Sequence, residues 1–332
     1  MQRILLITLT LLALLLALPG RASADYLYAT DLSNSNSQIY QVDKSTGALL
    51  AKIPTAAGAD TLIFNAQGDI IYSAYSVNGQ GQVRIINPAV GLSSDRLIAT
   101  VGNDAVDLAL DPGGKSVLVT SQSTGQIVRV NLSDGSTTLL ASGGYIGGVA
   151  YDSSGRLFAV RYGFGESIVQ LNPTTGTVIN STASSLTGLD GLAFDPFTGS
   201  LFASSRSING PSGREGFYEV SLQQSSFLQT SLITNSSFPT TFDPDGLEPD
   251  GQGNLYLASE ALRGDNKIYV YNEGTGNLSA LTVPLPGLDD LAPLIGGGAP
   301  PSVPEPSSIV LLGIGALSLL GYGRWTRCRI PQ

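Results

Sequence analysis

The sequence predicts an all-β protein, a six-bladed β-propeller, and the strongest evidence is a recurring phrase. The phrase consists of an apolar strand, a Gly-containing turn and a second alternating strand, and its clearest copy runs from Asp190 to Ser204. The first apolar residues of the six copies are Leu62, Leu108, Val149, Leu192, Leu247 and Leu291. The copies are therefore 46, 41, 43, 55 and 44 residues apart. Short strands repeating at such a period are typical of propellers.

Each full unit is expected to contain four strands. The expected third strands are residues 83–86, 127–130, 168–171, 217–220 and 268–271. The turn after the third strand often carries Gly, as in Asp43–Gly47, Asn172–Gly176 and Asn272–Gly276, where a positive φ is expected.

The two ends of the body are predicted to share one blade. Residues 25–53 match residues 254–282 at an offset of 229, so that Tyr40 falls on Tyr269 and Gly47 on Gly276. The first unit thus begins at its second strand, and the stub Asp289–Leu294 supplies the missing first strand. Pairing the stub with the N-terminal strands closes a ring of six and leaves no open array.

Composition excludes several classes of site. The chain has no His, and its single Cys, Cys328, lies near the end, so Ser-His-Asp triads, His-ligated zinc and internal disulfides are ruled out. Setting aside the five basic residues and the one acidic residue of the terminal segments leaves a body of 12 basic and 25 acidic residues, with a net charge of −13. Such a body repels a phosphate backbone, so we expect no nucleic-acid partner.

Residues 1–24 have the pattern of a secretory signal peptide. Arg3 precedes an apolar run from Ile4 to Leu18, and Ala22 and Ala24 form a small-residue cleavage site. The expected partners are the Sec translocon and signal peptidase. An uncleaved anchor is the alternative, although the run is short for a bilayer that needs about 20 residues.

Residues 296–332 are predicted to be a linker followed by a sorting signal. A Gly- and Pro-rich linker covers residues 296–303 after a propeller spanning 25–295. Pro304, Glu305 and Pro306 come next, followed by an apolar span from Ile309 to Gly323 and a basic cluster at 324–329. A membrane-spanning helix whose basic end stays in the cytoplasm is the expected state before processing.

The 29 residues from Pro304 to Gln332 closely resemble the PEP-CTERM sorting signal of Gram-negative bacteria, because the motif, the apolar span and the Arg cluster occur in order. The resemblance implies cleavage by an exosortase and transfer to the cell surface or the exterior. A simple membrane anchor is the alternative, and a eukaryotic lipid-anchor signal is disfavoured by the basic end.

The body resembles the gluconolactonase/strictosidine-synthase group and the NHL and YVTN-type propellers in its repeats and turns. The gluconolactonase-like group holds a divalent cation at the mouth of the central tunnel, but its Glu and Asn ligand motifs are not recognisable here. No catalytic residue is assigned from the sequence.

The tunnel mouth is nevertheless a candidate metal site. The residue before the first strand is an aspartate in four of the six units, namely Asp60, Asp190, Asp245 and Asp289, and Asp104, Asp107 and Asp290 lie nearby. Converging carboxylates raise one another's pKa unless a cation intervenes, and oxygen ligands favour Ca²⁺ or Mg²⁺. The alternative is that these aspartates accept hydrogen bonds from backbone N–H groups of the turns.

Two long loops share this face and are candidates for ligand recognition. They carry Arg206 and Arg214 in one loop and Glu260 and Arg263 in the other. The combined expectation is an exported, non-enzymatic binding or structural protein of the cell surface or extracellular matrix, with a surface polysaccharide or protein as partner. The alternative is a metal-dependent hydrolase or lactonase that uses tunnel-mouth aspartates.

Overall fold

The computed structural model describes most of the propeller body. The described residues are 26–31, 38–144, 146–161, 166–182, 186, 188–205, 216–222, 228–233, 238–239, 241–259, 265–285 and 287–293. Contacts divide the chain into Met1–Gly296 and Gly297–Gln332, and only the first unit contains described residues. The signal peptide with Ala22 and Ala24, and the sorting segment with Pro304, Glu305 and Pro306, lie outside them.

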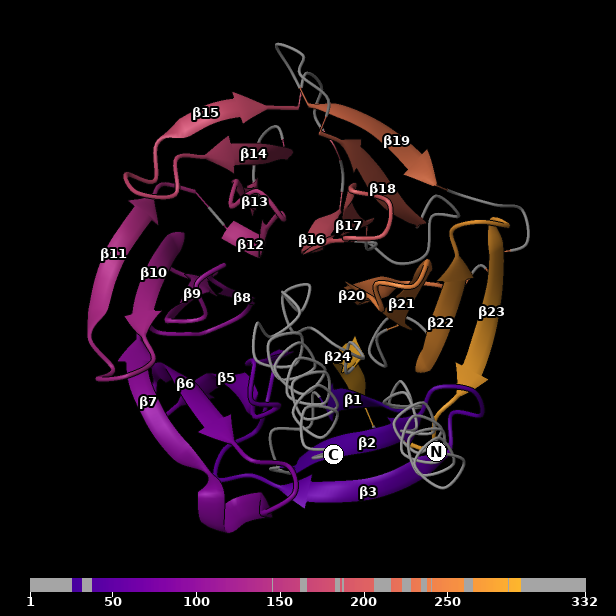
Figure 1. Ribbon diagram of the computed structural model, residues 1–332, viewed down its shortest axis with the longest axis horizontal. Helices are drawn as coiled ribbons and strands as arrows, with labels where there is room; N and C mark the ends of the chain where they lie inside the picture. Colours follow the sequence, from indigo (N-terminus) through magenta and orange to yellow (C-terminus); the bar gives the residue numbers. More distant parts are fainter. Residues whose placement is uncertain are drawn as a thin grey trace, which may run out of the picture. The chain divides into compact units, whose positions relative to one another are not determined.

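The described residues form six antiparallel four-stranded sheets, which we number as blades 1 to 6 (Figure 1). Blade 1 contains β24 (Leu288–Pro293), β1 (Tyr26–Asp31), β2 (Gln38–Asp43) and β3 (Leu49–Pro54). Blade 2 contains β4 (Leu62–Phe64), β5 (Ile70–Val77), β6 (Gln80–Ile86) and β7 (Arg96–Val101), with the short 3₁₀ turn η1 (Gly91–Ser94) before β7. Blade 3 contains β8 (Leu108–Leu110), β9 (Ser116–Ser121), β10 (Gln126–Asn131) and β11 (Thr137–Ser142).

The other three blades follow the same order. Blade 4 contains β12 (Ile146–Tyr151), β13 (Leu157–Arg161), β14 (Ser167–Leu171) and β15 (Val178–Ser181). Blade 5 contains β16 (Leu189–Phe194), β17 (Leu201–Ser205), β18 (Gly216–Ser221) and β19 (Gln229–Ile233). Blade 6 contains β20 (Pro244–Pro249), β21 (Asn254–Ser259), β22 (Lys267–Asn272) and β23 (Asn277–Thr282). In Figure 1 the labelled first strands, β8, β12, β16, β20 and β24, lie nearest the centre, and the fourth strands lie at the periphery.

The predicted closure of the ring is confirmed. β24 pairs with β1 in antiparallel register, so that Leu291 lies opposite Ala29 and Ala292 lies opposite Tyr28. Six blades, the predicted number, therefore close into a ring through a blade built from both ends of the body. The five predicted third strands also fall within β6, β10, β14, β18 and β22.

The hydrophobic core lies between the blades. The described buried apolar residues form six clusters, and each cluster joins two adjacent blades. The cluster between blades 6 and 1, for example, contains Leu27, Ile268, Leu288 and Leu291, each with a fully buried side chain. Successive side chains of a strand point to opposite faces of its sheet. Because both faces pack against neighbouring blades, second strands such as β17 are buried throughout.

The turns that contact a neighbouring blade require glycine. Gly176, in the turn after β14, has a φ of +70° and lies so close to the carbonyl of Leu140 in blade 3 that a Cβ would overlap it. Gly47 has a φ of +73°, and a Cβ there would lie 2.8 Å from the carbonyl oxygen of Thr282 in blade 6. The predicted positive-φ glycines thus also allow the turns to pack against the preceding blade.

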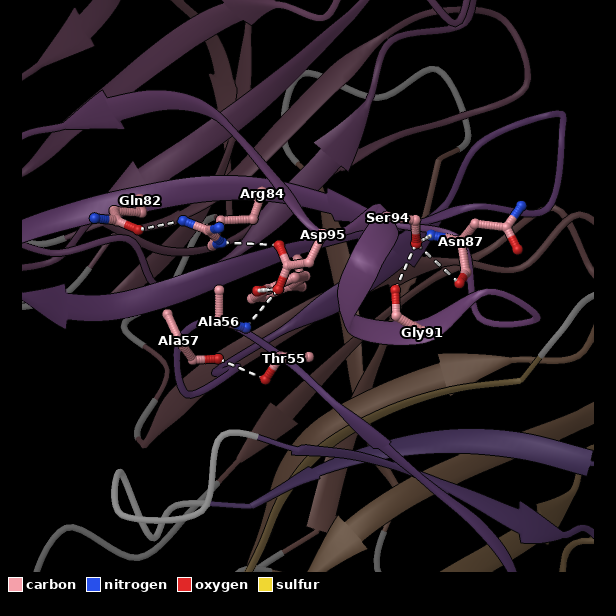
Figure 2. A network of polar contacts seen from close by, with 10 residues as sticks. Thr55, Ala56, Ala57, Gln82, Arg84, Asn87, Gly91, Ser94 and Asp95 are labelled. Carbon is pink, nitrogen blue, oxygen red and sulfur yellow. Dashed lines mark hydrogen bonds and ion pairs between the residues drawn. The ribbon is translucent and has the colours of Figure 1, made fainter.

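A buried ion pair fastens the connection from blade 1 to blade 2 (Figure 2). The Asp95 carboxylate, just after η1, accepts hydrogen bonds from Ala56 N at 2.5 Å, Tyr72 Oη at 2.6 Å and Arg84 Nε at 3.0 Å. The Asp95 side chain is fully buried and that of Arg84 is 12% exposed. One carboxylate therefore holds the segment between β3 and β4 against β5 and β6.

Candidate functional site

A bulge at the start of each inner strand shapes the centre of one face. In blade 5, Leu189 pairs with Ser205 and Leu192 pairs with Ala203, so that Asp190 and Gly191 together lie opposite Ser204. The registers of blades 1, 4 and 6 skip two inner-strand residues in the same way. Such bulges bend a strand and redirect its side chains. The residues predicted to lie at the tunnel mouth therefore leave the regular ladder at the axis.

Hydroxyl groups replace the missing ladder bonds at most of these bulges. Ser204 Oγ accepts from Gly191 N at 2.7 Å and donates to Asp245 O of blade 6 at 2.6 Å. The equivalent hydroxyls in blades 1, 2 and 3 belong to Thr30, Ser73 and Thr120, and each accepts from a bulge N–H. Thr30 and Ser73 also donate to the next blade, at Asp60 O and Val106 O. Side chains on the second strands thus fix neighbouring inner strands at the axis.

The bulges surround a pocket of about 160 Å³. Its lining includes all four aspartates predicted as metal ligands, Asp60, Asp190, Asp245 and Asp289. Asp107, Asp290 and Glu248 line the pocket too, which brings the number of carboxyl groups to seven, and no Lys or Arg is among the described lining residues. The four aspartates that the sequence predicted at the tunnel mouth thus line one pocket together, and three further acids extend its acidic character.

Two nearby acids, Glu248 and Asp104, differ from the sequence prediction. Glu248 was missed as a site residue, although the sequence holds a signal: the corresponding residue is a small alanine in Ala109, Ala150, Ala193 and Ala292. Asp104 was expected near the mouth but does not line the pocket. It is 2% exposed, and its carboxylate accepts hydrogen bonds from Ser121 Oγ and, at 2.9 Å, from Ser123 N.

One side of the pocket is backbone. The second bulge residue is Gly148, Gly191 or Gly246 in blades 4, 5 and 6, and a side chain at any of these positions would collide with the next blade. At Gly191, for instance, a Cβ would lie 2.9 Å from Asp245 O. The corresponding residues of blades 1, 2 and 3 are Asp290, Thr61 and Asp107. Acceptor and hydroxyl side chains therefore gather over blades 1 to 3.

Hydrogen bonds satisfy some of these carboxylates. Asp107 accepts from Val149 N of blade 4 at 2.7 Å and from Leu108 N at 2.8 Å. Asp290 accepts from the Thr61 hydroxyl of blade 2. Asp290 also accepts hydrogen bonds from the backbone N–H groups of Leu62 in blade 2 and of Leu291. Both aspartates thus bond to a backbone N–H group of the next blade, as the alternative to a metal site predicted.

Burial, more than mutual repulsion, makes four of the pocket carboxyls weaker acids than usual. Burial is the largest cause that raises the pKa of Asp60, Asp107 and Glu248 well above the usual value, and neighbouring carboxylates add to it. Burial likewise raises the pKa of Asp290 to about 6, against the opposing hydrogen bond from Thr61. A positive charge in the pocket would reverse these shifts, because it stabilises the ionised carboxylates.

The pocket offers no preformed metal centre. Within the part of the chain that the structure describes, no group of three Asp, Glu, His or Cys side chains is arranged to hold a metal ion. The four predicted ligands share the pocket lining but come from four different blades. Their role as metal ligands stays a prediction.

The remaining predicted site residues cannot be placed. Arg206, Arg214, Glu260 and Arg263, the proposed ligand-loop residues, lie outside the described residues, as does the predicted C-terminal membrane helix. Among the residues that are described, no helix is long and apolar enough to cross a membrane.

Comparison with solved structures supports the fold. The chain is similar to a protein of unknown function from Bacteroides caccae, with 15% identity, a TM-score of 0.59 and coverage of 80% of this chain and 97% of the other. It is also similar to a chain of the nidogen/laminin complex, with 14% identity, a TM-score of 0.59 and coverage of 80% and 96%. A third similar structure is the Cps50 (Swd1) β-propeller domain of Myceliophteria thermophila, with 12% identity, a TM-score of 0.55 and coverage of 80% and 86%. At such identities the likeness concerns the fold alone.

Comparison of the sequence identifies the sorting segment. No curated protein matches the chain. Residues 302–327 match the family model of the PEP-CTERM protein-sorting motif. The matched range contains Pro304, Glu305 and Pro306. The motif implies processing by an exosortase. The chain is therefore an exported protein that carries a PEP-CTERM sorting motif and a six-bladed β-propeller body.

Proposed function

We propose that this protein is a non-enzymatic binding protein of the cell surface or extracellular matrix, and that its axial pocket binds amino groups of an extracellular polysaccharide. The observation that carries the proposal is the convergence of seven carboxyl groups on one pocket without a described Lys or Arg in its lining. Ionised carboxylates only accept hydrogen bonds, so the complementary group is positively charged and donates them.

The size of the pocket favours one chemical group of a polymer over a whole small-molecule ligand. Its volume of about 160 Å³ is below the roughly 300–1,000 Å³ that usually encloses a complete ligand. Export through a sorting motif supports a partner outside the cell, and the resemblance to sorting signals of polysaccharide-producing bacteria supports a polysaccharide. Lysine side chains of a surface protein present the same chemistry and are distinguished by experiment.

The test compares two polymers that differ only in their amino groups. The exported protein is titrated calorimetrically with chitosan oligosaccharides and with fully acetylated chitin oligosaccharides at slightly acid pH. We expect heat of binding with the chitosan oligosaccharides and none with the chitin oligosaccharides. Because a bound cation favours ionised carboxylates, binding should also release protons, seen as a heat that depends on the buffer.

Variants locate the site. Asp245→Asn is expected to weaken binding by about tenfold, since one buried charge pair contributes on the order of 1.4 kcal/mol or more. The matched control is Asp134→Asn, in the exposed turn between β10 and β11, where an amide oxygen can still accept the hydrogen bonds from Ser136 N and Oγ. Equal affinity for chitin, or an affinity for chitosan that is unchanged in Asp245→Asn, contradicts the proposal. Preference for polylysine assigns a protein partner instead.

The competing hydrolase function makes a different prediction. Asp290, whose pKa is about 6, lies beside other carboxyl groups, and such a set is suited to acid–base chemistry. Turnover in a screen of lactones and phosphoesters, abolished by EDTA, would replace the binding proposal with a metal-dependent enzyme.

A further inference from the structure

A pair of acids, Asp195 and Glu273, meets where blades 5 and 6 touch, away from the axial pocket. Asp195 follows β16 in the first turn of blade 5, and Glu273 follows β22 in the last turn of blade 6. The two carboxyl groups lie within hydrogen-bonding reach of each other. This contact is independent of the proposed binding function.

Other contacts hold these turns together. The Phe197 ring, in the same turn as Asp195, lies over Gly253 of blade 6, where an added Cβ would be 2.9 Å from Phe197 Cε1. The Gly253 carbonyl in turn accepts a hydrogen bond from Glu273 N at 3.0 Å. The first turn of blade 5 is therefore packed on two turns of blade 6, and any repulsion between the acids acts directly on that contact.

Donors reach every carboxylate around Glu273 but not Glu273 itself. Asp195 accepts from Thr198 N at 2.6 Å and Thr198 Oγ1 at 2.7 Å, and Glu219 on β18 accepts from Ser200 Oγ at 2.8 Å. Both carboxyl oxygens of Glu273 are buried, and neither accepts a hydrogen bond from a described residue. Thr198 lies near Glu273 as well, but its hydroxyl hydrogen is directed to Asp195.

A buried carboxylate without a donor is costly, and a proton removes the cost. The protonated Glu273 carboxyl can donate to Asp195, whereas two ionised carboxylates at this distance repel each other. Burial, followed by the charge of Asp195, raises the pKa of Glu273 to about 7. Burial and the charges of Glu219 and Glu273 also raise the pKa of Tyr271 on β22.

The remaining charged group of this region is Asp250, in the turn between β20 and β21. It accepts from Asn254 Nδ2 at 2.9 Å and from Gln252 N at 2.8 Å, so its charge already has donors. The described acids and phenol that surround Glu273 are thus Asp195, Glu219, Tyr271 and Asp250, and none of them supplies a positive charge.

We propose that Asp195 and Glu273 share one proton across the boundary of blades 5 and 6, and that this contact loosens when the proton is lost near neutral pH. The direction follows from linkage. A carboxyl whose pKa is raised by folding binds its proton more tightly in the folded protein, so its stabilisation is present at low pH and is lost as the pH rises through its folded pKa. The exported protein would be tighter at this boundary in an acidic medium than in an alkaline one.

Hydrogen exchange of the exported protein tests the proposal locally, which matters because the pocket acids also titrate. After correction for intrinsic exchange, we expect protection of peptides covering 195–200 and 272–276 to fall by roughly tenfold between about pH 6 and pH 8. Glu273→Gln, which always carries a donor toward Asp195, should keep its protection at both pH values.

Asp195→Asn provides a second and independent variant. Asn keeps the acceptor for the Thr198 turn, as Asn172 and Asn272 do in other blades, while its amide donates to Glu273. Protection in Asp195→Asn should therefore not depend on pH either. The control, Glu219→Gln, leaves the pair intact and should retain the fall of the parent.

Three results would overturn the proposal. The parent protein could show equal protection at both pH values, or Glu273→Gln and Asp195→Asn could lose protection as the parent does. The third result concerns calcium: parent protection that is full at both pH values in millimolar calcium and is lost at both in EDTA would assign a cation, and not a proton, to the pair.

Discussion

At the scale of single residues, the axis is held by hydroxyl groups that belong to two blades at once. Ser204 is fully buried and bonds to Gly191 of its own blade and to Asp245 of the next. The corresponding residues of blades 4 and 6 are Val160 and Ala258, which cannot form this bridge. The pocket aspartates thus rest on a scaffold that is fastened unevenly around the ring.

Removing the Ser204 hydroxyl is expected to destabilise the protein without changing its fold. Ser204→Ala leaves a buried N–H and a buried carbonyl without their partner, at a cost of about 1–3 kcal/mol. Ser204→Thr retains the hydroxyl, as Thr30 and Thr120 do in other blades, and should lose much less. Urea unfolding measures the difference, and exposed Ser279→Ala is the control. If Ser204→Ala unfolds like that control, the bridge contributes nothing.

The candidate site could be predicted only as far as the repeat reached. Aspartates at one position of four repeats must meet when the repeats form a ring, so the sequence located Asp60, Asp190, Asp245 and Asp289 at a common mouth. Glu248 and the hydroxyl bridges depend on which residues lie opposite the bulge. Periodicity cannot supply that register, because a bulge shifts pairing by one residue without changing the spacing of repeats.

At the scale of elements, connections between blades are secured by side chains outside the repeat. The segment between β3 and β4 has no ladder partner of its own, and Asp95 binds Ala56 of that segment together with Tyr72 and Arg84 (Figure 2). No pattern in the sequence predicted this network. Asp95 follows η1, which has no counterpart among the repeats, and the network needs residues 39 positions apart.

Neutralising Asp95 should loosen that connection. Asp95→Asn leaves Arg84 without its ion pair and places an amide where three donors converge, so we expect a loss of about 3 kcal/mol. Urea unfolding gives the total, and hydrogen exchange at residues 54–58 should rise more than exchange in blade 4. Asp134→Asn, at an exposed turn, should change neither quantity. Unaltered exchange at residues 54–58 would show that packing alone holds the segment.

At the scale of the whole molecule, stability depends on a strand that lies at the far end of the sequence from its partner. Leu288 and Leu291 of β24 are fully buried in the cluster between blades 6 and 1, and Ala292 joins the cluster between blades 1 and 2. This arrangement was predictable because the match at an offset of 229 residues left the first unit one strand short. The carboxyl pair at blades 5 and 6 was not, because it depends on how non-repeating turns pack.

Ending the chain after Gly287 is expected to prevent folding of the propeller, whereas ending it after Leu294 should not. Each fully buried leucine that is removed costs about 2–5 kcal/mol. The two losses together approach the whole free energy of unfolding of a domain.

A permutant separates loss of the strand from loss of the ring. Placing residues 287–293 before Tyr26, joined by a copy of the Asp250–Gly253 turn that links β20 to β21, makes blade 1 continuous in the same order as the other blades. The permutant should show a cooperative thermal transition by circular dichroism close to that of the chain ending at Leu294. An equally cooperative transition in the chain ending at Gly287 would mean that five blades and three strands fold without closure.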